Sequence, residues 1–193
     1  MGRSKLWLPF GDETLLQRIV RRLSDATAPV LVVAAPRQRL PRLPAGVRVA
    51  RDPAPGLGPL AGLATGLRVM EPLAPAAFVT STDAPFLEPA FVRRLCVLFS
   101  DEHDAVIVQA AGRLHPLGAI YACRLHRRAA ELLARGERQV VALLGGNRTR
   151  VVRPAELLAD GELAAADPEL RSLRNLNTPA QYRRALQDAG HRR

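Results

Sequence analysis

The sequence predicts an α/β fold with a mostly parallel sheet and helices on both faces of that sheet. Two observations support this prediction. Short apolar runs without internal alternation are typical of strands that are covered on both faces, as in a parallel sheet. Stretches whose apolar residues recur at the helical period separate these runs, so that strands and helices alternate as in βαβ units.

Six segments are expected to form strands, of which four are continuous apolar runs and two are shorter candidates. In chain order they are 29–34, 47–50, 76–80, 104–108, 117–121 and 149–152. Sheets of this kind bind ligands at the carboxyl ends of their strands. The loops that follow Ala34, Ala50 and Thr80 are therefore the first places to look for a site.

Five segments are expected to form helices, in chain order 13–23, 59–70, 89–98, 124–135 and 179–190. Asp12 is in position to cap the first helix, and Thr178 is in position to cap the last. Pro59, Pro89 and Pro179 stand at helix starts, where the missing N–H of proline costs no hydrogen bond.

Length and composition indicate one globular domain of a cytoplasmic protein. With 193 residues, of which 48% are hydrophobic, the chain is long enough and apolar enough to bury a core. It has no apolar run of about eighteen residues and no signal-like start, so neither a membrane span nor secretion is expected. The two cysteines, Cys96 and Cys123, have no metal-type spacing and are interpreted as reduced buried thiols.

The basic charge is better matched to an anionic small molecule than to nucleic acid. The formal net charge is +10, and all but one of the 28 basic residues are arginines. The excess is spread along the chain, aromatic residues make up only 4%, and no basic run with interleaved aromatics occurs. No nucleic-acid partner is therefore expected.

The segment 79–85, Val-Thr-Ser-Thr-Asp-Ala-Pro, is the sharpest chemical feature. It places Asp83 just beyond a buried strand, in a loop that Pro85 closes. A carboxylate there suits Mg²⁺, which is usually held by one or two carboxylates together with substrate phosphates. The alternative is that Asp83 only caps a turn or the next helix, and spacing alone does not decide between the two.

Two further features suit phosphates. Gly56, Gly58 and Gly62 lead into a helix, whose N-terminus attracts anions, although a turn with close helix packing also explains them. Lys5 is the single lysine of the chain, and a compact ammonium charge suits phosphates. The alternative is that Lys5 is simply solvated.

Three polar side chains in two other segments are candidates for binding a substrate. Asn175 and Asn177 are two positions apart, so their side chains share a face if the segment is extended; helix capping is the alternative. His115 is expected in a loop, either as an anion ligand or acid–base group or as a structural residue. No Ser/His/Asp set, HExxH motif or Walker loop is visible, so a covalent nucleophile is not expected.

Taken together and in this order, the segments resemble the molybdenum cofactor guanylyltransferases, which make molybdopterin guanine dinucleotide. The opening residues 1–16 look like the second half of the first motif of that family. The other matching segments are Arg51–Pro53, Gly58–Gly62, Thr82–Phe86, Arg113–Pro116, Gly136–Arg138 and Asn175–Pro179, so the resemblance spans nearly the whole chain. It implies a three-layer Rossmann-like fold of the nucleotide-diphospho-sugar transferase type, formed as a single domain by residues 1–193.

The resemblance also implies a reaction and its participants. The terminal phosphate of molybdopterin would attack the α-phosphorus of GTP, and pyrophosphate would leave. Mg²⁺ would be the cofactor, and a receiving molybdoenzyme or a cofactor-delivery protein would be a partner. Transfer of this kind needs positioning and charge neutralisation more than a protein nucleophile.

Roles for individual residues follow from the same resemblance. Asp83 would bind Mg²⁺ and contact the nucleotide phosphates, and Lys5 would neutralise those phosphates. Asp52 and Gly58 would lie on the nucleotide side. For the pterin or metal side, the resemblance points to His115, Asn175 and Asn177.

This sequence departs from the pattern of the family in two places. Ala34-Ala35-Pro36 stands where the family often has an asparagine, which makes guanine specificity less secure. Residues 1–193 are also expected to be an N-terminally truncated domain, without the first strand and Gly-rich loop of the family. Either the start is assigned about 15–20 residues too far downstream, or the truncation is real and nucleotide affinity is poor.

Three alternative functions stay open. The chain could be a cytidylyltransferase for the same pterin, a sugar-phosphate nucleotidyltransferase, or an inactive module that binds the cofactor. Turnover with CTP or ATP in place of GTP distinguishes the first two, and cofactor binding without GTP dependence indicates the third.

Overall fold

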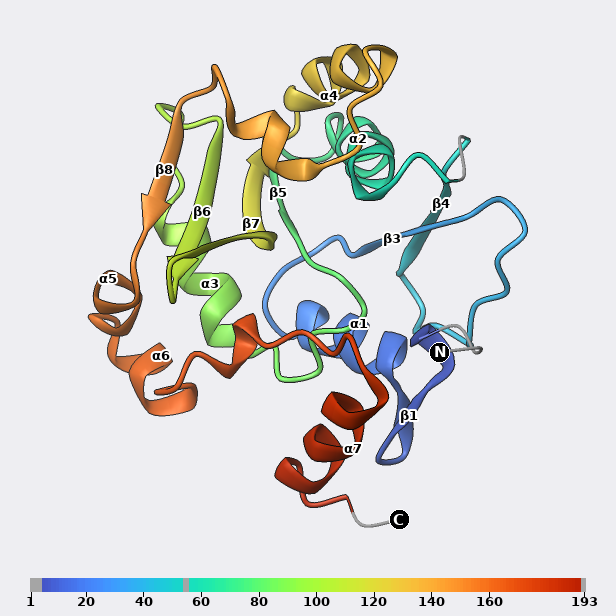
Figure 1. Ribbon diagram of the computed structural model, residues 1–193, viewed down its shortest axis with the longest axis vertical. Coiled ribbons are helices and arrows are strands. Elements are labelled where there is room, and N and C mark those ends of the chain that lie inside the picture. Colours follow the sequence, from blue (N-terminus) through green and yellow to red (C-terminus); the bar gives the residue numbers. More distant parts are fainter. Residues whose placement is uncertain (1–4, 54–55, 192–193) are drawn as a thin grey trace.

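The computed structural model describes residues 5–53 and 56–191, which form three layers, with strands in the middle and helices on either side (Figure 1). Helices α1 (Leu15–Ser24), α3 (Pro89–Leu98), α5 (Pro154–Leu158) and α6 (Gly161–Ala166) contribute to one apolar core. Helices α2 (Pro59–Met70) and α4 (Leu125–Ala134) contribute to the other. Helix α7 (Pro179–Asp188) packs near the N-terminal strands. The α/β class with helices on both faces is confirmed.

The strands of the described residues form three separate sheets. Strands β1 (Pro9–Phe10) and β2 (Glu13–Thr14) make a short hairpin, and β3 (Leu31–Ala34) pairs in parallel with β4 (Arg48–Arg51). The main sheet has the order β5-β7-β6-β8 and consists of Ala76–Val79, Arg113–Ala122, Ala105–Ala110 and Thr149–Val152. Within this sheet β6 and β8 pair in parallel, whereas β7 pairs antiparallel with both β5 and β6.

The sheet is more mixed than the sequence predicts, because β6 and β7 form a tight hairpin. Ala111 and Gly112 connect them with φ values of 48° and 72°, the left-handed pair that matches the twist of a two-residue hairpin turn. The apolar-run pattern identified the strands but not their direction. The hairpin also extends β7 back to Arg113, so His115 lies within a strand and not in the predicted loop.

Helix caps agree with the sequence at one end of the chain and differ at the other. Thr178 caps α7 as predicted, since the Gln181 amide donates to its hydroxyl at 3.1 Å. Asp12 does not cap α1, and the prediction is wrong there. Thr14 caps α1 instead, because β2 carries the extended chain two residues further. The Thr14 hydroxyl accepts from the Gln17 amide, and the Thr14 amide donates to Gln17 Oε1 at 2.9 Å.

Two other predictions concern the burial of the cysteines and the presence of a membrane-spanning segment. Cys123 is buried as predicted, whereas Cys96 is exposed; both are free thiols. Within the described ranges, no helix is long and apolar enough to cross a membrane.

A cleft of about 460 Å³ separates β3 from β5. Helices α1, α2 and α3 also line it, and the lining residues include no charged side chain. Among the described residues, no strand pairs with the edge of β3 or of β5 that faces this cleft. Helix packing, not a continuous hydrogen-bonded ladder, therefore connects the β3–β4 pair to the main sheet.

Candidate active site

Lys5 connects its own segment to two others that lie far away in the sequence, the loop after β5 and the segment before α7. Its ammonium nitrogen Nζ donates to Asp83 Oδ2 at 2.9 Å, to the Leu176 carbonyl oxygen at 2.8 Å and to Asn177 Oδ1 at 3.3 Å. An ammonium group has three donors, so these three acceptors satisfy it. The structure thus brings together three of the residues that the sequence predicts as site residues.

Asp83 is held on both of its carboxylate oxygens and on its backbone. It lies in the loop after β5, as the sequence indicated, and its side chain is 15% exposed. Ser81 donates a hydrogen bond to Oδ1, while Lys5 contacts Oδ2. The Leu176 amide donates to the Asp83 carbonyl at 2.8 Å, so the loop after β5 and the segment before α7 are fixed to each other.

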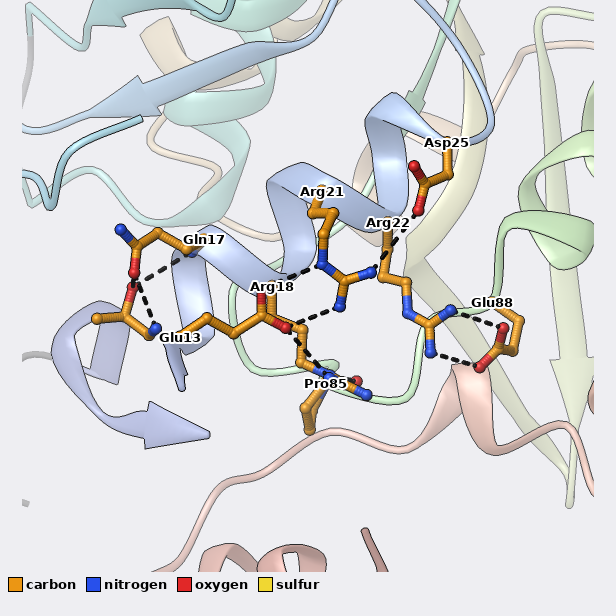
Figure 2. Close-up of polar contacts among 9 residues, drawn as sticks. Glu13, Gln17, Arg18, Arg21, Arg22, Asp25, Pro85 and Glu88 are labelled. Atoms are coloured by element: carbon orange, nitrogen blue, oxygen red, sulfur yellow. Dashed lines mark hydrogen bonds and ion pairs between the residues drawn. The ribbon is translucent and has the colours of Figure 1, made fainter. Parts of the chain in front are cut away.

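An arginine network on α1 holds the far end of the same loop (Figure 2). Arg18 Nε donates to the Pro85 carbonyl at 2.6 Å, and Arg22 forms an ion pair with Glu88 at 3.1 Å. Glu13 in turn accepts a hydrogen bond from Arg18 at 3.2 Å. Burial alone would raise the pKa of Glu13, but the hydrogen bonds and positive charges of Arg21 and Arg18 together lower it. Residues 83–88 are therefore anchored at both ends.

Two of the glycine-containing motifs meet at the start of α2. Gly58 precedes Pro59 with φ of 78°, and a Cβ at this position would lie 3.0 Å from the Arg138 carbonyl oxygen. The same carbonyl accepts from the Leu60 amide at 3.3 Å. The motifs 58–62 and 136–138 are therefore one structural unit, and Gly58 allows their close approach.

Replacement of Gly58 by alanine tests this unit. We expect Gly58→Ala to lower the free energy of unfolding by about 2–3 kcal/mol, because the left-handed backbone is strained and the new Cβ meets a carbonyl oxygen. Gly56→Ala is the matched control, since Gly56 also has positive φ but open space around its Cβ position, and about 1 kcal/mol is expected there. Urea denaturation measures both; equal losses would show that the Arg138 contact has no effect.

Asp52 and His115 lie apart from the Lys5 cluster. Asp52 follows β4, and its amide donates to the Ala34 carbonyl at 2.8 Å, which places it at the carboxyl ends of β3 and β4. His115 lines a second cavity of about 820 Å³, together with residues of α5, α7 and the segment 168–174. Burial and the nearby Arg113 charge lower the pKa of His115, so the imidazole is neutral near pH 7.

Asn175 stands beside the cluster without a side-chain hydrogen bond to it among the described contacts. The sequence missed three participants: Ser81, Arg18 and the Leu176 carbonyl. Ser81 lies two residues before Asp83 in the same motif, which was a usable signal. A backbone carbonyl and an arginine on a distant element give no sequence signal, because only the tertiary structure brings them to the site.

Known proteins resemble this chain over most of its length. A family model described as "MobA-like NTP transferase domain" matches residues 1–151. A protein of Mycobacterium avium named "Probable molybdenum cofactor guanylyltransferase" is 35% identical over 190 residues, covering 97% of this chain and 89% of the relative.

Solved structures match the fold. Molybdopterin-guanine dinucleotide biosynthesis protein A from Archaeoglobus fulgidus has a TM-score of 0.77 at 21% identity, covering 98% of this chain and 92% of that one. 2-C-methyl-D-erythritol 4-phosphate cytidylyltransferase from Thermus thermophilus has a TM-score of 0.69 at 19% identity, covering 97% and 94%. At these identities the likeness concerns the fold alone.

Proposed function

Because this chain belongs to the family of MobA-like NTP transferase domains, we propose that it transfers GMP from GTP to the terminal phosphate of molybdenum–molybdopterin and releases pyrophosphate. Its fold is the nucleotidyltransferase fold of the nucleotide-diphospho-sugar transferase type. The observation that carries the proposal is the contact of Lys5 with Asp83 and Asn177. These three residues belong to three different motifs that the family shares.

The chemistry of these side chains suits nucleotidyl transfer. The acceptor phosphate is itself the nucleophile, so the protein has to position two anions and neutralise their charge. Lys5 supplies a positive charge on a flexible stem, and its side chain is 32% exposed. It can therefore turn from Asp83 to the phosphates of a bound nucleotide.

Asp83 fits a magnesium ion that is shared with substrate. Within the described part of the chain, no group of three or more His, Cys, Asp or Glu side chains could enclose a metal by itself. Mg²⁺ commonly takes one or two carboxylates and completes its shell with water and phosphate oxygens. Asp83 would hold the ion; when bound, Mg²⁺ supplies further neutralisation of the phosphate charge.

We assign the two substrates to opposite sides of this cluster. Asp52 and Gly58 lie on the side of β3, β4 and α2, which is the proposed GTP side. His115, Asn175 and Asn177 lie on the side of β7 and of the segment before α7, which is the proposed molybdopterin side. A cytoplasmic location and a molybdoenzyme or cofactor-delivery partner belong to the same proposal.

The test is pyrophosphate release by the chain with GTP, molybdenum–molybdopterin and Mg²⁺. We expect release that requires both substrates and stops when a chelator removes the metal. CTP and ATP are the comparison nucleotides, because Ala34–Pro36 lacks the asparagine that the family often has near the base. Faster turnover with CTP would make the chain a cytidylyltransferase, and binding of the pterin without any turnover would make it a binding module.

A further inference from the structure

Four arginines line the cavity that contains His115. Arg113 comes from β7, Arg171 and Arg174 come from the segment after α6, and Arg184 comes from α7. Two acidic residues, Glu169 and Asp188, also line it. Asp188 forms an ion pair with Arg174, and the remaining guanidinium groups outnumber the remaining carboxylate, so the cavity attracts anions.

The segment that carries Arg171 is fixed in place. Asp167 is 3% exposed, and its carboxylate accepts from the amides of Arg171 at 2.6 Å and Ser172 at 2.9 Å. The Ser172 hydroxyl accepts from the Glu88 amide at 3.0 Å, which joins this segment to the loop after β5. These contacts therefore hold in place the backbone that carries the side chains of residues 171–174.

Arg171 has unused hydrogen-bonding capacity. Its guanidinium carbon lies 4.1 Å from the centroid of the Phe86 ring, and its Nη2 atom is buried with no hydrogen-bond partner among the described residues. The exposed donors of a guanidinium group that stacks on a ring can still bind a planar or tetrahedral anion, and Arg171 lines the cavity. Phe86 lies three residues after Asp83, so Arg171 stands beside the catalytic loop.

The other walls of the cavity are apolar. They consist of small and aliphatic side chains: Ala110, Ala111, Pro154, Leu158, Pro168, Leu170 and Leu173. A volume of about 820 Å³ is within the ~300–1,000 Å³ that small-molecule sites occupy. Apolar walls with convergent guanidinium groups suit a flat heterocycle that carries an oxyanion.

We propose that this cavity, called the arginine cavity, holds the oxyanion-bearing heterocycle of the acceptor, with Arg113 and Arg171 binding its tetrahedral oxyanion. The proposal rests on the proposed function. Arg171 lies outside the motifs that the sequence shows, whereas Arg113 begins the motif Arg113–Pro116. The segment from Arg174 to Asn177 connects the cavity to Lys5, since the Leu176 carbonyl and the Asn177 side chain both accept from Nζ. An acceptor seated here thus lies next to the phosphate-binding cluster.

Titration calorimetry with molybdate and with inorganic phosphate tests the cavity without turnover. We expect each oxyanion to bind the chain at low ionic strength, and the affinity to fall at least about tenfold in Arg171→Gln and in Arg113→Gln. Preference for one oxyanion tells whether the molybdenum end or the phosphate end of the acceptor is held. Arg113 is exposed on the hairpin, so its replacement leaves the fold intact even if Arg171→Gln does not.

Arg68→Gln is the matched control, because Arg68 is exposed on α2 and does not line the cavity. The same loss of affinity in Arg68→Gln, or unchanged affinity in both cavity variants, would overturn the proposal. In the transfer assay, the cavity variants should raise KM for the acceptor and leave KM for GTP unchanged. Anion binding that depends on both arginines, in a chain that transfers no nucleotide, would contradict the proposed function and support the cavity.

Discussion

Asp83→Ala is expected to lower kcat/KM for GMP transfer by at least ~10³-fold, the largest effect of any single substitution in this chain. The carboxylate is the group that we assign to Mg²⁺, and Lys5 alone cannot replace it, because an ammonium ion does not bind a metal. The fold should survive, since the hydrogen bond from the Leu176 amide goes to the Asp83 carbonyl and is independent of the side chain.

Steady-state pyrophosphate release and Mn²⁺ binding measure this effect. Mn²⁺ substitutes for Mg²⁺ at oxygen sites, so its dissociation constant in the presence of GTP reports the metal site directly. Asp101→Ala is the control, because Asp101 is an exposed carboxylate outside the cluster. Unchanged turnover in Asp83→Ala would remove Asp83 from the mechanism.

Lys5→Ala is expected to lower kcat/KM by about 10²-fold, mainly through weaker binding of the nucleotide phosphates. Its loss also leaves Asp83, Leu176 and Asn177 without the cation that joins them. The segment before α7 should consequently lose some of its protection from hydrogen exchange, which a purely electrostatic role at the phosphates would not produce.

Lys5→Arg distinguishes charge from geometry. Three acceptors surround one nitrogen in this site, and a planar guanidinium group spreads its donors over three nitrogens in a fixed fork. We therefore expect the arginine variant to recover less than about a tenth of wild-type kcat/KM. Full recovery would show that only the charge at position 5 matters.

The sequence contained the identities of the site residues but not their arrangement. Lys5, Asp83 and Asn177 each belong to a motif that can be read from the chain, and in the structure Lys5 contacts the other two. Lys5 and Asp83 are 78 positions apart in the sequence. Local sequence patterns cannot predict a contact between residues so far apart. The roles of these residues stay predictions until the variants are measured.

Two differences between the predicted and the observed structure have local physical causes. Asp12 and Thr14 are both good capping residues, and only the β1–β2 hairpin, two residues in each strand, decides between them. His115 precedes a proline, which favours a loop, yet the turn at Ala111 and Gly112 extends pairing as far as Arg113. In both cases a short antiparallel pairing overrides the single-residue preference.

Because no strand pairing among the described residues crosses the cleft between β3 and β5, we expect this corner of the molecule to deform more readily than the main sheet. Hydrogen-bonded ladders resist shear cooperatively, whereas apolar side chains slide past one another in small independent steps. The position of Asp52 relative to Asp83 is set by the packing of β3 on α1 and α2, because no ladder crosses the cleft in the described ranges. We therefore expect the two sides of the proposed substrate site to adjust their spacing when a ligand binds.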